Sequence, residues 1–132
     1  MQFMLIMNSP RDGYAQYLDW PEKIRAANVA FMRDVTRRLA ESGELVLTEG
    51  LASPTQARRV RAGADGRPVT DGVFPESKEF LAGWWIVDVA DAERAYAIAA
   101  EVSAAPGLPT RGEAHFWIEV RQVMSCHKDM TA

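Results

Sequence analysis

Two stretches of the sequence have the apolar period of an amphipathic helix, and each lies between segments that are patterned like strands. Over residues 22–42 the apolar side chains recur at three- and four-residue steps, and Gly43 follows at the position where helices commonly end. A second stripe runs over residues 92–102, after Asp91, a residue type typical of helix N-caps. Because each helix must bury its stripe, both are predicted to pack on a sheet. The stripes consist of Ile24, Ala27, Phe31, Val35 and Leu39, then Ala95, Ile98, Ala99 and Val102.

The segments around these helices alternate or are rich in branched and aromatic residues, as strands are. In the second of them Leu45, Leu47 and Leu51 alternate with polar or smaller residues, which puts Glu49 on the leucine side. Two arms around an Asp-Gly turn read as a β-hairpin. The expected strands are residues 2–8, 45–51, 57–61 and 67–70 (the hairpin, with its turn at 63–66), 83–89 and 115–123.

The resulting order is β-α-β-hairpin-β-α-β, which predicts the ferredoxin-like, split β-α-β plan of an α+β protein. Its two helices are expected on one face of an antiparallel sheet, and the hairpin is an insertion. No repeat, linker or low-complexity run divides the chain, so we expect a single domain over residues 1–123 and a flexible tail over 124–132.

The second face of such a sheet is expected to be uncovered by helices, yet its residues are not uniformly polar. In the last strand Phe116, Ile118 and Val120 would occupy one face, while Trp117 would share the other with charged residues. Trp84 and Trp85 are adjacent, so at least one of them points away from the helices. A half-apolar, half-charged face predicts a partner, most simply a second copy of the chain. Two such sheets would enclose a cleft.

Composition excludes several classes of function. The chain has 132 residues, 25% of them charged, and a net charge of −3, so neither nucleic acid nor an anionic membrane is an expected partner. The single cysteine, Cys126, cannot form an internal disulfide and fits a reducing compartment. The N-terminus lacks the flanks of a signal peptide and is too short to cross a bilayer, so we expect a cytoplasmic protein.

The loop between the hairpin and the aromatic strand concentrates charge in a short space. We select Asp71, Glu76 and Lys78 as catalytic candidates, with Asp71 as a general base and the other two binding or polarising a small polar substrate. The alternative is structural, because Asp71 precedes Gly72 and suits a turn, while Lys78 suits a pairing that pins the loop to the sheet. Both readings stay open on the sequence.

A second group of candidates lies on the strands. Glu119 and Arg121 are two residues apart and rise on one face, where with Glu49 they would bind an acidic ligand or, alternatively, form ion pairs across a dimer interface. His115 shares that face and is an outside catalytic candidate, or alternatively a satisfied or exposed structural histidine. The remaining ligand-binding candidates are Glu79, Trp85 and Trp117.

Neither a metal nor a cofactor is expected. Cys126 and His127 are adjacent in the tail, but a metal site needs further ligands. The sequence also lacks the glycine-rich phosphate loops, the nucleophile elbow and the zinc-binding helix motif.

The loop also forms part of a longer motif, Val69-Thr70-Asp71-Gly72-Val73-Phe74-Pro75-Glu76-Ser77-Lys78-Glu79. Shorter motifs accompany it along the chain: Gly43-Glu44-Leu45, Glu49-Gly50-Leu51, Gly83, Ala95 and Ile118-Glu119-Val120-Arg121. In these residues, and over nearly its whole length, the chain resembles YCII-related proteins of the DGPF-domain group, with Val73 where the family usually has proline.

The resemblance implies a ferredoxin-like fold that dimerises into an α+β barrel, with a cleft lined by the loop and the open sheet face. Some relatives are taken to be small acid-base enzymes with a His-Asp pair, and some occur fused or adjacent to sigma factors. Three hypotheses follow: a cofactor-free enzyme that abstracts a proton or eliminates a group, a ligand-binding or regulatory module associated with transcription, and a purely structural dimer.

Overall fold

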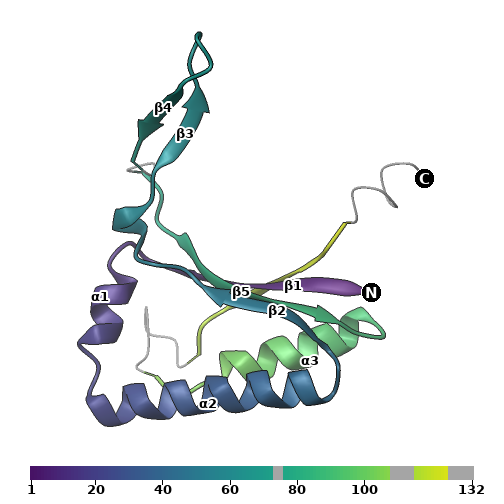
Figure 1. The fold of residues 1–132 in the computed structure, drawn as a ribbon. Helices are drawn as coiled ribbons and strands as arrows, with labels where there is room; N and C mark the ends of the chain where they lie inside the picture. The colour runs from purple at the N-terminus through teal and green to yellow at the C-terminus, as the bar shows by residue number, and fades with distance from the viewer. Residues whose placement is uncertain (73–75, 108–114, 125–132) are drawn as a thin grey trace.

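A four-stranded antiparallel sheet with two long helices on one face forms the body of the protein (Figure 1). The computed structural model describes residues 1–72, 76–107 and 115–124. The elements in chain order are β1 (Gln2–Ser9), α1 (Gly13–Leu18), α2 (Glu22–Glu41), β2 (Leu45–Gly50), the 3-10 turn η1 (Pro54–Gln56), β3 (Arg59–Ala62), β4 (Pro68–Asp71), β5 (Phe80–Asp88), α3 (Ala92–Ser103) and β6 (Ile118–Gln122).

The strand order in the sheet is β2-β5-β1-β6, and every neighbouring pair is antiparallel. With the hairpin set aside, this is the ferredoxin-like order, so the predicted fold is confirmed. Strands β3 and β4 form a separate two-stranded sheet. In Figure 1 this hairpin rises from one end of the sheet, on the side away from α2 and α3.

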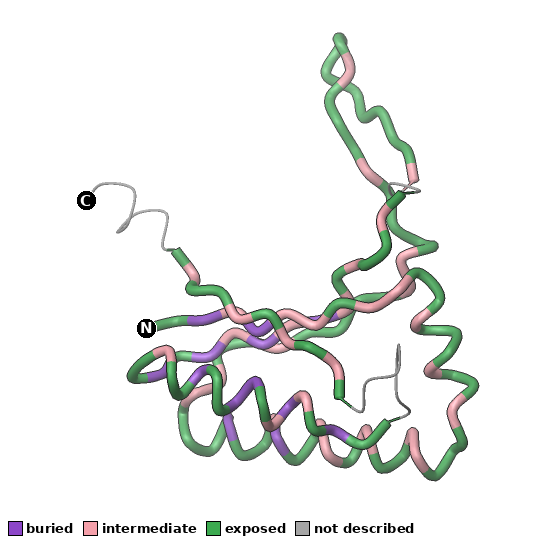
Figure 2. The backbone as a smooth tube through the Cα atoms, turned by 180° about the vertical axis from the view of Figure 1, so that it is seen from behind, coloured by how far each residue is buried: buried purple, intermediate pink, exposed green. Residues whose placement is uncertain are grey.

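The core lies between the sheet and the two long helices (Figure 2, purple). Both predicted stripes contribute to it, although unequally. In α3 all four predicted residues are buried, whereas in α2 only Val35 and Leu39 are fully buried and Ala27 is exposed. The first half of α2 continues beyond the sheet, so its apolar side has no strand to cover it (Figure 1).

A β-bulge changes how β2 presents its side chains. Leu45 pairs with Val87 and Leu47 with the next residue, Ile86, so Val46 is an extra residue in β2. Leu45 therefore packs toward the core, while Leu47 is 43% exposed on the other face. The expectation that all the leucines of this strand share one side was wrong. Glu49 shares the side of Leu47 and not that of Leu45.

Strand β6 is shorter than the sequence predicts. It begins at Ile118 rather than at residue 115, because β1 offers partners to β6 only from Phe3 to Met7. Beyond Met7 the register of β1 against β5 shifts, and Asn8 pairs with Leu81. Trp117 and His115 thus precede the strand and are exposed.

Helix α1 was not expected, since residues 11–20 look polar and turn-rich. Tyr14 and Tyr17 are three residues apart and their rings stack with centroids 6.4 Å apart, and Tyr17 contacts Trp20 at 5.3 Å. Aromatic side chains at this spacing lie on the same side of a helix. That spacing was the available signal for α1.

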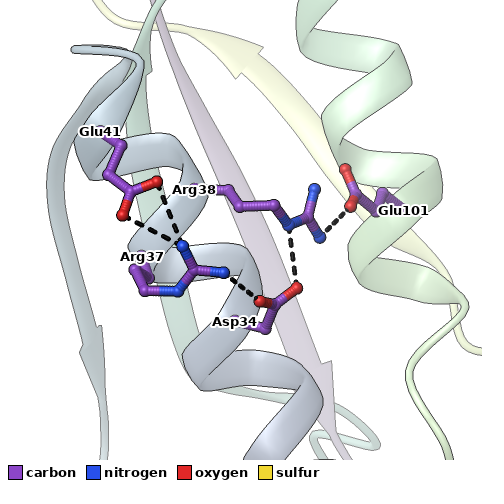
Figure 3. Close-up of polar contacts among 5 residues, drawn as sticks. All are labelled: Asp34, Arg37, Arg38, Glu41 and Glu101. Atoms are coloured by element: carbon purple, nitrogen blue, oxygen red, sulfur yellow. Dashed lines mark hydrogen bonds and ion pairs between the residues drawn. The ribbon is translucent and has the colours of Figure 1, made fainter.

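Ion pairs join the elements at the edge of the core. Asp34 accepts hydrogen bonds from Arg37 and Arg38, and Arg38 also pairs with Glu101 of α3 (Figure 3). These two guanidinium groups lower the pKa of Asp34. The α2–α3 packing therefore has a polar rim in addition to its apolar centre.

A bidentate ion pair links Glu44, just before β2, to α3. Arg94 donates to both carboxylate oxygens of Glu44, each at 2.8 Å, and Ser42 Oγ donates to the same carboxylate at 2.9 Å. The hydrogen bonds from Arg94, assisted by Ser42 and by the positive charge, lower the pKa of Glu44 to about 2.

Within the described ranges, no helix has both the length and the apolar character needed to cross a membrane.

Candidate functional site

The face of the sheet that carries no helix, which we call the open face, is organised in rows across the four strands. The strand pairing aligns Glu49, Trp84, Ile6 and Glu119 in one row, and Leu47, Ile86, Met4 and Arg121 in the next. Directly paired residues share a face. The centre of the open face is therefore apolar, and its charges lie on the two edge strands.

This arrangement separates residues that the sequence had grouped. Glu49 is on β2 and Glu119 is on β6, so three strand spacings, about 14 Å, lie between their backbones. Glu119 and Arg121 remain neighbours on one strand, and both are exposed. A single small ligand cannot engage Glu49 and this pair together.

Asp71 ends β4, out on the hairpin. Its carboxylate pairs with Arg59 at 2.9 Å, accepts the N–H of Gly72 at 2.8 Å and is 78% exposed. Arg59 Nε also donates to the carbonyl of Gly72 at 2.5 Å. In the single chain Asp71 has the surroundings of a surface ion pair that closes the base of the hairpin.

The other loop candidates are also at the surface. Glu76, Lys78 and Glu79 are all exposed, and Phe80 begins β5 with Arg11 stacked 5.6 Å from its ring centroid. Val73, Phe74 and Pro75 of the same loop, and Cys126 and His127 of the tail, lie outside the described residues. Among the described residues, no hydrogen bond or ion pair joins Asp71 to Glu76 or Lys78, the other two catalytic candidates.

The tryptophans divide between the two faces. Trp85 is 6% exposed in the core beside the helices, whereas Trp84 lies on the open face. Trp117 precedes β6 and is 83% exposed, the largest exposed fraction among the large apolar residues described. The expectation that one of Trp84 and Trp85 points away from the helices is therefore confirmed, with Trp84 as that residue. Trp85, selected as a ligand contact, lies on the helix side.

A pocket of about 420 Å³ lies at the end of the sheet that carries α1. Six aromatic residues line it, together with apolar side chains and backbone from β1, α2, β2 and β5. The aromatic residues are Tyr14, Tyr17, Trp20, Trp84, Trp85 and Phe116. Apolar pockets of this size with a few polar groups are the usual form of small-molecule sites.

Local structure explains why the pocket is held open. The first half of α2, which extends past the sheet, contributes Asn28 and Met32 to one wall. Asn28 donates to the carbonyl of Pro106 at 2.9 Å, and Gly107 packs so closely on Trp20 that an added Cβ would lie 2.6 Å from the indole. These contacts fix the wall made by α2 and the Trp20 ring.

The strands complete the pocket with little side-chain bulk. Gly50 and Gly83 are paired across β2 and β5, and both line the pocket. Thr48 on the same strand donates to the carbonyl of Trp84 at 3.0 Å, so its hydroxyl is already occupied.

Sequence reasoning missed most of this pocket. It placed the cleft on the open face and selected Trp85 and Glu49 of the lining, but not the aromatic residues of α1 or the polar Asn28. The three-residue spacing of Tyr14, Tyr17 and Trp20 was the signal that would have indicated them.

Among the described residues, no three His, Cys, Asp or Glu side chains come together in a way that suits a metal ion.

The chain is similar to known proteins. The family model of the YCII-related domain matches residues 1–108. An uncharacterized protein from Rhizobium meliloti (strain 1021) is 36% identical over 77 residues, which cover 56% of this chain and 62% of that protein. The matched part is thus less than two thirds of the relative's length.

Proposed function

The chain belongs to the YCII-related domain family, and from this premise we propose that it binds a small aromatic molecule in the pocket between α1, α2 and the end of the sheet. The observation that supports this proposal is the lining of this cavity of about 420 Å³, which includes six aromatic residues. Aromatic side chains stack well on flat ligands and lose little entropy in doing so.

An acid-base enzyme with Asp71 as its base is less well supported by the single chain. A general base needs a site that excludes water and raises its pKa. Asp71 is 78% exposed and paired with Arg59, and it does not line the pocket. Ligand binding without catalysis, as in a regulatory module, is the function that these contacts favour.

The binding proposal is tested by titrating the protein with indole while following its amide resonances by NMR. Shifts are expected at pocket residues such as Gln16, Asn28 and Gly83. Ala52 lines the pocket, so Ala52→Trp should block indole binding, while Ala57→Trp, on an exposed residue of the same connection outside the lining, should not. Absence of shifts at the pocket, or equal binding by both variants, would contradict the proposal.

We also propose that a second copy of the chain covers the open face. The apolar centre with charges at its edges has the composition of an interface, in which a polar rim surrounds an apolar core. The β3–β4 hairpin rises on this same side of the sheet and would flank the second copy (Figure 1).

Light scattering at micromolar concentration tests this second proposal. A dimer is expected, and Ile86→Glu at the centre of the open face should yield monomers because it would bury an unpaired charge. The matched control is Val60→Glu on the hairpin, where the replaced side chain is 63% exposed. A monomeric wild-type protein would refute the proposal.

A further inference from the structure

A second cavity, of about 460 Å³, lies between α2 and the strands β2 and β5, next to the aromatic pocket. The two cavities share four lining residues, which are Asn28, Met32, Thr48 and Trp85. Trp85 belongs to the core beside the helices, and Thr48 is paired with it across the strands, so both side chains face the helix side of the sheet. The pocket and the second cavity therefore form one continuous groove along α2.

Helix α2 presents a regular side to the second cavity. Its six lining residues form two neighbouring rows at four-residue steps, namely Asn28, Met32 and Thr36, then Val29, Arg33 and Arg37. Residues at this spacing lie one above the other on the same side of a helix. Met32 packs against the core, so its row faces the sheet, and the row that contains Arg33 lies at the border of the groove.

Arg33 differs from the other charged residue of this lining. Of the described residues that line the second cavity, Arg33 and Arg37 alone are charged. Arg37 pairs with Asp34 at 2.6 Å and with Glu41 at 3.0 Å. Within the described ranges, no hydrogen bond or ion pair engages Arg33, and this residue is exposed. Its guanidinium group is thus available to an anion.

The acidic residue that borders the pocket does not cancel this charge within the groove. Glu49 is paired with Trp84 across the strands, and its side chain lies on the open face of the sheet. The groove therefore combines an aromatic end, beside α1, with an unpaired cation farther along α2. About five residues of helix, or roughly 7 Å, separate Asn28 in the pocket from Arg33.

A guanidinium group and aromatic walls together favour one class of ligand. Arginine forms charge-assisted hydrogen bonds to a carboxylate, often two in parallel. Aromatic side chains supply stacking and apolar contact to a flat ring. A neutral aromatic molecule would gain only the second contribution, and an amine would be repelled by the arginine.

Resting on the proposed ligand-binding function, we propose that the groove selects aromatic molecules that carry a carboxylate on a short chain. The ring lies among the aromatic residues of the pocket, the chain passes Met32 and Thr48, and the carboxylate pairs with Arg33. Arg33 is a specificity-determining residue: it sets which ligands bind and does not form the pocket.

The test compares phenylpropionate, which is ionised at neutral pH, with phenylpropanol and phenylpropylamine, which keep the ring and the chain and change the charge. Affinities are measured by NMR titration or calorimetry at low ionic strength. We expect phenylpropionate to bind about 3- to 5-fold more tightly than phenylpropanol, as an ion pair provides at an exposed site. Phenylpropylamine is expected to bind most weakly. The side-chain Nε–H resonance of Arg33 should shift with phenylpropionate and not with phenylpropanol.

Two variants with the same change in net charge separate a local effect from a general one. Arg33→Gln should remove the preference for phenylpropionate and leave the affinity for phenylpropanol unchanged. Arg61→Gln is the matched control, because Arg61 is an exposed residue of the β3–β4 hairpin outside both linings. It should leave both affinities unchanged.

The outcomes are distinguishable. Equal affinity for phenylpropionate and phenylpropanol, or equal losses in the two variants, would overturn the selection of carboxylates while leaving the aromatic pocket in place. Failure of all three probes, together with failure of indole, would overturn both proposals.

Discussion

Leu5 and Ile6 are neighbours on β1, and the contrast between them is repeated across the whole sheet. Leu5 faces α2 and α3 and is 0% exposed, whereas Ile6 faces away and is only partly covered. On β5, Trp85 and Trp84 differ in the same way. The two faces are built by the same strands, yet within the single chain helices cover only one of them. The open face has the apolar centre of an interior and the accessibility of a surface.

The difference between the two faces is tested most directly by truncating the two neighbouring side chains on β1. Leu5→Ala should lower the free energy of unfolding by about 2–5 kcal/mol, because it leaves a cavity in a closed core. Ile6→Ala should cost less than about 1.5 kcal/mol in the monomer, since its surroundings already admit water. Urea denaturation at low protein concentration measures both.

Equal losses from these two variants would show that the open face is as well covered as the helix face within one chain. The comparison between the faces would then be wrong.

A second prediction concerns the paired glycines of β2 and β5, which give neither face a side chain. Gly83→Ala would place a Cβ 2.9 Å from the carbonyl oxygen of Glu49, so we expect a loss of about 1–3 kcal/mol as β2 is pushed away. Gly50→Ala is the matched control, because its Cβ would meet nothing within 4 Å. The measurement is the free energy of unfolding of each variant. A neutral Gly83→Ala would show that the two strands separate at little cost.

A third prediction tests what charge adds at the border of the helix face. The pKa of Glu44 is lowered from 4.5 to about 2, so its pair with Arg94 stabilises the folded state above the ordinary pKa of a glutamate. That contribution is lost as the pH falls through the folded-state pKa. Since the pair is partly exposed and screened by solvent, we expect about 1 kcal/mol.

Glu44→Gln isolates this contribution. The difference in unfolding free energy between wild type and variant should be largest at about pH 6 and should shrink as the pH falls toward about 2, where the folded-state carboxylate also begins to be protonated. Glu41→Gln, which removes an exposed ion pair with Arg37 within α2, serves as the comparison. A difference that does not change with pH would rule out the ion pair as its cause.

The smallest expected effect is that of Trp117→Ala. Trp117 is 83% exposed, so removal of its side chain should change the unfolding free energy of the monomer by no more than about 0.5 kcal/mol. Chemical denaturation at a concentration below that of dimerisation measures this. A loss above about 1 kcal/mol would show that another part of the chain covers the ring, and the open face would then be partly closed.

The helices and the strand order could be predicted because their signals are local and repeated. The stripe of α3, from Ala95 to Val102, is buried as expected, and Gly43 has the positive φ of 76° that suits the end of α2. Alternation within β6 also placed Glu119 and Arg121 on one face correctly. These features depend on periods of two or three to four residues, which are visible in a sequence.

The site could not be predicted in the same way, since it depends on where elements stop relative to one another. Ala27 belongs to the apolar stripe of α2 yet is exposed, because the first half of this helix extends beyond the sheet. The same overhang forms a wall of the pocket through Asn28. No local pattern records the length of a helix relative to the sheet beneath it. The charged loop was conspicuous in the sequence for its composition, and its described residues lie at the surface.

The bulge at Val46 has a consequence for comparing relatives. With this residue present, Glu49 faces the open side and Thr48 faces the helices. A homologue that lacked one residue here would have the same residues in the rest of β2, but each side chain would lie on the opposite face of the sheet. An alignment without a gap at this position would then equate a carboxylate of the open face with a residue that faces the core. The count of residues between Gly43 and Gly50 is therefore a better guide to which side chains a homologue presents on its open face than the identity of the glutamate alone.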